Sequence, residues 1–225
     1  MTYQDTLNIL FENSDETRAI FNSKIIFTKA KNLGVKSDIT LGIAKQLAKD
    51  KTDVSDFPIN VYHEINLIIG ISTMLRKDLS SDKKFEFIES FFPKVDNWAV
   101  VDSTAAKFKI KDFELAKRYL NKFIKSKYTF VRRYVYVCLL DNFTKSECVD
   151  FINKMLRNDS EYYVQMAESW LISNLAIKGL KQETINILNR DDLDKVIINK
   201  AISKICDSFR VSKEDKNEYR KYRRK

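Results

Sequence analysis

The stretch NVYHEINLIIGISTMLRK, residues 60–77, decides the fold class of this chain. Its apolar side chains recur on nearly every side of an expected helix, which predicts a helix that is buried on most of its faces. His63 and Glu64 open this helix, and we interpret them as a structural polar pair that faces the interior. The flanking sequence indicates that the neighbours of this helix are also helices.

The composition favours a helical protein over a β protein. Only 4 Gly and 2 Pro occur in 225 residues, so the residues that form tight turns are scarce. Amphipathic spacing of apolar residues predicts helices along almost the whole chain. The expected helical ranges are 5–31 (one helix or two), a helix capped by Ser37 or Asp38, 60–77, a helix that starts at Ser80–Asp82 and ends at Pro93, 96–107, 111–126, 129–140, 146–157, 160–179, 182–189, 193–209 and 213–222.

Two segments carry local signals besides helical periodicity. Gly34 follows Asn32 and Leu33, where a glycine is expected just past a helix C-terminus. The run from Phe130 to Leu140 is rich in β-branched and aromatic residues, which allows a strand by propensity. Because it lies among helical segments, we predict a buried helix there instead.

The lengths and the spacing of the expected helices predict a particular helical architecture. Helices of roughly 12 to 18 residues joined by short polar turns, with a pair every 30 to 45 residues or so, are typical of stacked helical hairpins. The predicted fold is therefore all-α, a curved superhelical solenoid of HEAT-like helical hairpins. We expect residues 1–225 to form a single domain with a basic tail at about 210–225. The alternative is a globular helical bundle.

Positive charge is concentrated in two segments. The chain carries a formal net charge of +9, and residues 104–133 hold ten Lys and Arg against two acids, a net of +8. Residues 210–225 have a net of +5. Such clustering indicates a polyanionic partner for the central block. For the tail alone, a solvated helix face with a frayed end is the expected state.

Several classes of protein are disfavoured. Cys138, Cys148 and Cys206 are widely spaced, and His63 is the only histidine, so we expect no metal site, no cofactor and no His-dependent nucleophile. Residues 1–12 do not resemble a secretory leader, and no apolar run reaches 18 residues. We therefore expect a cytoplasmic, nucleoid-associated protein of bacterial type that does not bind membranes, and a monomer.

One short motif points to chemistry. In Val95-Asp96-Asn97-Trp98-Ala99-Val100-Val101-Asp102-Ser103, a helix would place Trp98 and Asp102 on the same face, one turn apart. The spacing is a weak pattern by itself, because a core indole and a solvated or capping carboxylate would also produce it. A second tryptophan, Trp170, lies on a later expected helix.

These segments together resemble one known family. The motif around Trp98 and Asp102 is similar to the signature of the DNA alkylation repair family, the HEAT-like-repeat alkylpurine DNA glycosylases of AlkD type. Phe130-Val131-Arg132-Arg133 resembles the family's arginine-bearing helix, and the segment 162–170 resembles its helix with the second tryptophan. The segments 199–205 and 209–213 are similar to the ends of family members, so the likeness covers most of the chain in the same order.

The resemblance implies a function and a set of site residues. Family members with the full set hydrolyse the N-glycosidic bond of cationic alkylated purines, such as N3-methyladenine and N7-methylguanine, in duplex DNA. By position, Asp102 would be the catalytic carboxylate, and Trp98 and Trp170 would flank the deoxyribose of the lesion. Arg133 would hold a backbone phosphate, with Arg132 as the competing candidate. Lys125 and Lys127, just before the arginine-bearing helix, are the first choices for further DNA contacts.

The residue types suit this chemistry. A cationic purine is already a good leaving group, so the remaining demand is to stabilise an oxocarbenium-like sugar. A fixed carboxylate and two indole faces favour that cation. The prediction is a monofunctional glycosylase of base excision repair. The alternatives are a non-catalytic protein of the same fold that binds distorted or branched DNA, and a protein-binding helical scaffold.

Overall fold

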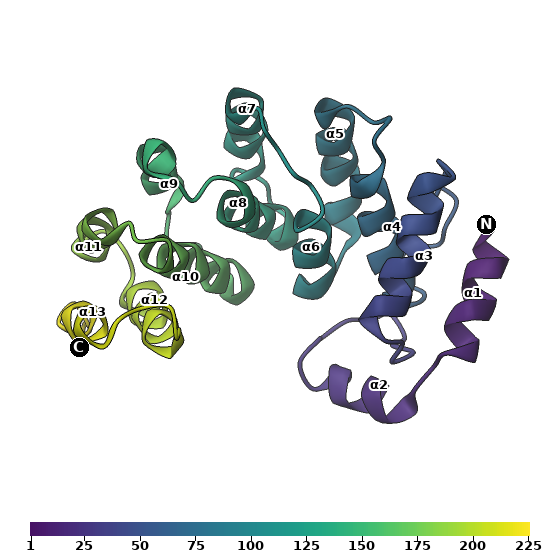
Figure 1. Ribbon diagram of the computed structural model, residues 1–225, viewed down its shortest axis with the longest axis horizontal. Coiled ribbons are helices and arrows are strands. Elements are labelled where there is room, and N and C mark those ends of the chain that lie inside the picture. Colours follow the sequence, from purple (N-terminus) through teal and green to yellow (C-terminus); the bar gives the residue numbers. More distant parts are fainter. The chain divides into compact units, whose positions relative to one another are not determined.

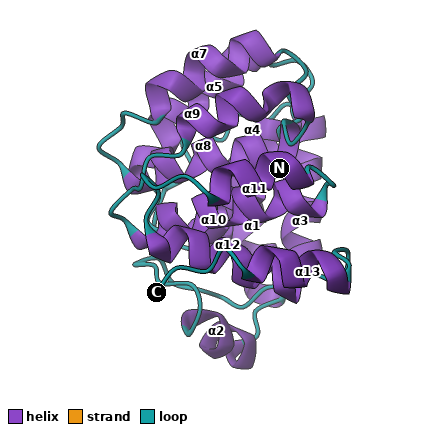
Figure 2. Cartoon of the chain, turned by 90° about the vertical axis from the view of Figure 1, so that its left-hand side faces the viewer, coloured by secondary structure: helices purple, strands orange, loops and turns teal.

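The computed structural model describes residues 1–225, and every regular element in it is a helix (Figures 1 and 2). The chain forms thirteen α-helices and two short 3-10 turns, with a single isolated bridge between Lys31 and Tyr62 in place of any strand. The predicted all-α class is confirmed. None of the helices combines the length and the apolar character needed to cross a bilayer. The chain divides into two compact units, residues 1–110 and 111–225.

The first unit is built around one central helix. Its elements are α1 (Tyr3–Glu12), α2 (Glu16–Ser23), α3 (Ser37–Lys49), α4 (His63–Leu75), α5 (Ser81–Phe91), the 3-10 turn Phe92–Lys94 and α6 (Trp98–Ala105). Helix α4 packs against α3, α5 and α6, and nearly all of its side chains are buried. The prediction that residues 60–77 hold a helix buried on most sides is thus confirmed.

Helices α4 and α6 approach each other closely at one glycine. A Cβ atom added to Gly70 of α4 would lie 2.0 Å from Oγ1 of Thr104 on α6. Only a residue without a side chain permits this contact. Gly70 therefore fixes how near α6, which carries Trp98 and Asp102, lies to the core of the unit.

The segment between α2 and α3 differs from the sequence prediction. Helix was expected up to about residue 31 with Gly34 just past its end, but α2 ends at Ser23 and no helix begins again before Ser37. Gly34 instead has φ +71°, and a Cβ there would lie 2.1 Å from the Asp15 carbonyl oxygen. Long-range hydrogen bonds hold this segment extended, including Lys31 N–H to Val61 O and His63 N–H to Lys31 O.

Glu64 is a structural group, as the sequence indicated. Its carboxylate is buried and accepts backbone N–H groups of Leu33, Gly34 and Val35 at 3.0 to 3.4 Å. Burial raises the pKa of Glu64, and these hydrogen bonds counteract that rise only in part. His63 is buried beside it, but its Nδ1 has no hydrogen-bond partner, so the expected satisfied pair holds for the glutamate alone.

The second unit is a row of helices centred on α10. Its elements are α7 (Phe113–Phe123), α8 (Thr129–Asn142), the 3-10 turn Ser146–Cys148, α9 (Val149–Met155), α10 (Tyr162–Ile177), α11 (Lys181–Leu188), α12 (Lys195–Asp207) and α13 (Lys213–Arg220). Helix α10 packs against α8 on one side and α12 on the other. The predicted buried helix at residues 129–140 is confirmed by α8, whose central residues are buried.

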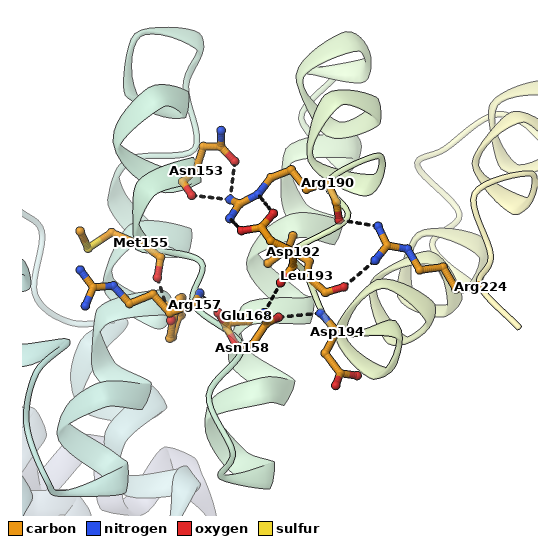
Figure 3. Close-up of polar contacts among 11 residues, drawn as sticks. Asn153, Met155, Arg157, Asn158, Glu168, Arg190, Asp192, Leu193, Asp194 and Arg224 are labelled. Atoms are coloured by element: carbon orange, nitrogen blue, oxygen red, sulfur yellow. Dashed lines mark hydrogen bonds and ion pairs between the residues drawn. The ribbon is translucent and has the colours of Figure 1, made fainter.

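Side-chain hydrogen bonds connect the loops of this unit to one another (Figure 3). Asn158, at φ +57°, donates to the Asp192 carbonyl and accepts the Asp194 N–H at 2.6 Å. Arg190 donates to the Asn153 carbonyl and side chain at 2.6 and 2.7 Å. Buried Glu168 of α10 accepts the Arg157 N–H at 2.8 Å, much as Glu64 holds a loop in the first unit. These bonds fix the ends of α10 and α12.

Three further expectations were wrong. Neither Ser37 nor Asp38 caps α3, because the N-cap position is Lys36 and makes no side-chain hydrogen bond there. Several helices are shorter than the expected 12 to 18 residues, since α2, α6, α11 and α13 each have 8. The end of the chain is not frayed, because Arg224 makes hydrogen bonds to three backbone carbonyls.

Candidate functional site

Trp98 and Asp102 lie on the same face of α6. The helix begins at Trp98, and its other face buries Ala99, Val100 and Val101. Trp98 and Asp102 are both half-buried, so the indole and the carboxylate occupy successive turns at the margin of the core. The helix is fixed at its start by Asn97, whose side chain accepts the Val100 N–H at 3.2 Å. A carboxylate and an aromatic face are thus presented together on a rigid element.

The edge of the Trp98 ring is anchored to a distant segment. Its Nε1–H donates to the Ile25 carbonyl at 3.1 Å. The neighbouring Asp96 accepts the Thr28 hydroxyl and the Lys29 N–H, both at 2.7 Å. The segment that follows α2 is therefore attached to the residues that precede and begin α6, which restricts how the indole can turn.

Asp96 is held in its charged form. Burial raises the pKa of Asp96, but the hydrogen bonds from Lys29, Thr28 and Asn97 outweigh burial and leave the pKa below its usual value. Sequence reasoning did not single out Asp96 as a site residue. The signal available was an Asp-Asn pair directly before a helix, which is typical of a capping segment, whereas its partners lie 67 and 68 residues away.

A hollow opens beside α6 on the first unit. It has a volume of about 440 Å³ and is lined by Ser37 and Asp38 of α3, Ile71 of α4, and Ser103 and Lys107. Ser103 is the residue after Asp102. The hollow therefore lies next to the helix that carries Trp98 and Asp102, although neither of these two side chains lines it.

The two candidate arginines of α8 differ in their contacts. Arg132 forms a two-pronged ion pair with Asp159 and also donates to the Ser126 carbonyl at 2.8 Å. The hydrogen bonds to Asp159 raise the pKa of Arg132, and the two side chains are only 15% and 12% exposed. This geometry indicates that Arg132 holds the loop before α10 in place.

Arg133 connects α8 to the start of α10. Its Nη1 donates to the Tyr163 carbonyl at 2.6 Å, and the residue is 5% exposed. Phe130, one turn earlier, packs its ring 5.7 Å from the ring of Tyr163. The guanidinium therefore lies at an aromatic margin of the second unit, with limited access to solvent.

Trp170 borders a second hollow. The indole is 36% exposed on α10, in a depression of about 550 Å³ lined also by Asn174, by Lys204 and Asp207 of α12, and by Phe209 and Arg210. Phe209 is 90% exposed, and the Arg210 guanidinium lies 5.5 Å from the centre of its ring. Two aromatic faces and two cations thus share one open surface, which suits nucleotides. Phe209 was not among the site residues predicted from the sequence.

Lys125 and Lys127 are both exposed just before α8. The Lys127 ammonium lies 5.2 Å from the centre of the Tyr128 ring. Tyr128 occupies the N-cap of α8 and makes no capping hydrogen bond through its side chain. An uncapped helix start with two neighbouring lysines is suited to anions.

The predicted site residues therefore fall into two groups. Trp98 and Asp102 are brought together on α6 of the first unit, and Arg132, Arg133, Lys125, Lys127 and Trp170 lie in the second. The convergence of the two groups on one lesion stays a prediction. No group of three or more His, Cys, Asp or Glu side chains is arranged to hold a metal ion.

Comparison with known proteins gives one match. A family model described as DNA alkylation repair enzyme matches residues 7–205. No curated protein matches the chain, and no solved structure matches it either. The matched range contains α6, α8 and α10, and so every site residue predicted from the sequence, whereas Phe209 and Arg210 lie beyond it.

Proposed function

Because the chain belongs to the DNA alkylation repair enzyme family, we propose that it is a monofunctional DNA glycosylase acting in base excision repair. Its substrates are cationic alkylated purines in duplex DNA, such as N3-methyladenine and N7-methylguanine. The observation that carries this proposal is the arrangement on α6, where an anchored indole and a carboxylate share one face inside the matched range.

The reaction is hydrolysis at the anomeric carbon of the damaged nucleotide. As the C1′–N bond breaks, its electron pair goes to the purine and neutralises the positive charge that alkylation placed there. The oxygen of a water molecule forms the new bond to C1′, and one proton of that water is released. The products are the free base and an abasic site.

Asp102 stabilises the sugar cation that forms during this step and orients the water. Preorganised electrostatic groups of this kind are worth about 3 to 4 kcal/mol each. The faces of Trp98 and Trp170 add cation–π attraction of roughly 1 to 2 kcal/mol when desolvated. These interactions are stronger with the cationic transition state than with the neutral sugar, which is the condition for catalysis.

The scaffold and the cations serve DNA binding. We propose that the helices stack as a HEAT-like superhelix in which Lys125, Lys127 and Arg133 contact backbone phosphates. The exposed lysines before the uncapped start of α8 support this role. Phosphate contacts of this type bind duplexes of any sequence and weaken with added salt.

The test is release of base from methylated DNA. Duplex DNA treated with a methylating agent is incubated with the protein, and the free purines are separated and quantified. The proposal expects 7-methylguanine and 3-methyladenine to appear, with alkali-labile abasic sites in equal amount. A protein that binds the duplex tightly but releases no base would contradict the enzyme and favour a DNA-structure binder on the same scaffold.

A further inference from the structure

A strongly basic hollow lies at the end of the second unit, separate from the predicted site residues. It has a volume of about 420 Å³ and is lined by Lys195, Asn199, Lys200 and Ser203 of α12 and by residues 223–225. No carboxylate side chain lines it. A depression bordered by five cationic side chains and no acidic side chain is an electrostatic site for a polyanion.

The last residues of the chain are folded onto α12 by Arg224. Its guanidinium donates to the carbonyls of Leu188 and Arg190 at 2.9 and 2.6 Å and to that of Leu193 (Figure 3 shows the contacts to Arg190 and Leu193). The Asn199 side chain and the Arg224 backbone exchange two further hydrogen bonds, of 2.9 and 3.0 Å. The tail is thus anchored through one arginine.

Anchoring Arg224 directs its neighbours outward. Arg224 is half-buried, whereas Arg223 and Lys225 on either side of it are exposed at the hollow. The Arg223 guanidinium is held by a 2.9 Å hydrogen bond to the Ser203 hydroxyl. Two cations that sequence reasoning assigned to a frayed end are therefore presented on a defined surface.

This surface continues along α12 toward Trp170. Lys200 and Lys204 are one turn apart on α12, and Lys204 lines the hollow that contains Trp170 and Phe209. Lys195 and Lys200 both line the basic hollow, which extends this surface to the start of α12.

We propose that α12 and the anchored tail form a phosphate track that holds the backbone of duplex DNA beside the Trp170 hollow. The track is made by Lys195, Lys200, Lys204, Arg223 and Lys225. Its partner is the DNA backbone, since the cations gather at a hollow without acidic side chains and Lys204 continues their surface to one with exposed aromatic rings. The identification of this polyanion as DNA rests on the proposed function, whereas the site itself does not require glycosylase activity.

The test compares two double variants, each of which loses two positive charges. In Arg223→Gln/Lys225→Gln the track loses two cations but keeps the Arg224 anchor. In Lys213→Gln/Arg220→Gln, the matched control, two exposed cations of α13 outside the track are removed. Dissociation constants are measured for an undamaged duplex across a series of salt concentrations. Each lost phosphate contact lowers the slope of log affinity against log salt by about 0.9.

The slope of log affinity against log salt should be smaller by about 2 in the track variant and unchanged in the control variant. Both variants should melt at the wild-type temperature. Equal slopes in all three proteins, or equal reductions in both variants, would overturn the track. Binding of poly-glutamate that depends on Arg223 and Lys225, without an effect on duplex binding, would overturn it in favour of an acidic protein partner. Because undamaged DNA is used, a failure to release methylated bases leaves this result intact and affects only the proposed function.

Discussion

The Trp98 indole donates a 3.1 Å hydrogen bond from Nε1 to the backbone carbonyl of Ile25, a residue 73 positions earlier in the chain. Asp96, two residues before Trp98, binds Thr28 and Lys29 of the same segment. The indole that we propose to face the sugar is therefore oriented by the loop after α2 as well as by its own helix. Positioning of this kind is required where a reacting group must be held closely.

Replacing Trp98 by Phe tests this anchor. The phenyl ring keeps an aromatic face but has no N–H for the Ile25 carbonyl, and its attraction for cations is weaker than that of an indole. A lost hydrogen bond is worth about 1 kcal/mol, so we expect release of 7-methylguanine to slow by roughly tenfold or more. Affinity for undamaged duplex should stay at the wild-type value. Release at the wild-type rate would show that the anchor has no part in catalysis.

The close approach of α4 and α6 predicts a sensitive glycine. In Gly70→Ala the new methyl group meets Thr104, and overpacking of this type costs about 1 to 3 kcal/mol of unfolding free energy. Adding Thr104→Ala removes the nearest atoms and should restore part of the loss. Gly42→Ala on α3 is the matched control, because nothing lies within 4 Å of its added Cβ. Urea unfolding gives the unfolding free energy of the wild type and of the three variants. Equal destabilisation by Gly70→Ala and by Gly42→Ala would contradict the contact.

His63 predicts a dependence of stability on pH. Burial lowers the pKa of His63 from 6.5 to about 4, although the charge of Asp96 acts in the opposite direction. The unfolded chain thus binds a proton below pH 6.5 while the folded chain does not, so stability is complete above pH 6.5 and falls as the pH drops toward 4. The slope is about 1.4 kcal/mol per pH unit.

The variant His63→Leu separates the contribution of His63 to the pH dependence of stability from the contributions of other groups. The unfolding free energy of the wild type minus that of His63→Leu should fall by about 2 kcal/mol between pH 7 and pH 5. Glu64 and the other carboxyls titrate in both proteins, so their effects cancel in the difference. A difference that does not change over this range would contradict a buried, neutral His63.

The two arginines of α8 are expected to respond differently to glutamine. Arg132→Gln breaks the ion pair with Asp159 and should lower the unfolding free energy by about 2 kcal/mol, and Asp159→Asn should have a similar effect. Arg133→Gln removes the hydrogen bond to the Tyr163 carbonyl and should also lower the unfolding free energy, but it should in addition weaken duplex binding and reduce its salt slope by about 1. Denaturant unfolding and binding titrations distinguish the two roles. A weakened salt dependence in Arg132→Gln alone would reverse the assignment.

The helices were predictable because their signals are local. The apolar run around Ile65 to Met74 and the mixed run after Phe130 both give buried helices, and the spacing of Trp98 and Asp102 places them on one face once that helix forms. Glu64 was recognised as structural because a carboxylate in so apolar a helix needs hydrogen bonds from its surroundings.

The features that were missed depend on partners far along the chain. Residues 24–31 have helical spacing, yet hydrogen bonds to Val61 and Asp96 keep them extended. The last residues have the composition of a solvated tail, but Arg224 finds three carbonyls more than 30 residues earlier. Periodicity and composition contain no information about such pairs, because either partner alone is an ordinary polar group.

The most direct test of the central claim is the rate of 7-methylguanine release by Asp102→Asn. The substitution keeps the shape of the side chain but removes the charge that we propose to stabilise the sugar cation, so release should fall by about 10² to 10³-fold. Asp50→Asn, at an exposed carboxylate of the same unit, should release base at the wild-type rate and serves as the control. Affinity of Asp102→Asn for undamaged duplex should equal or exceed that of the wild type. Release of 7-methylguanine by Asp102→Asn at the wild-type rate would contradict the account.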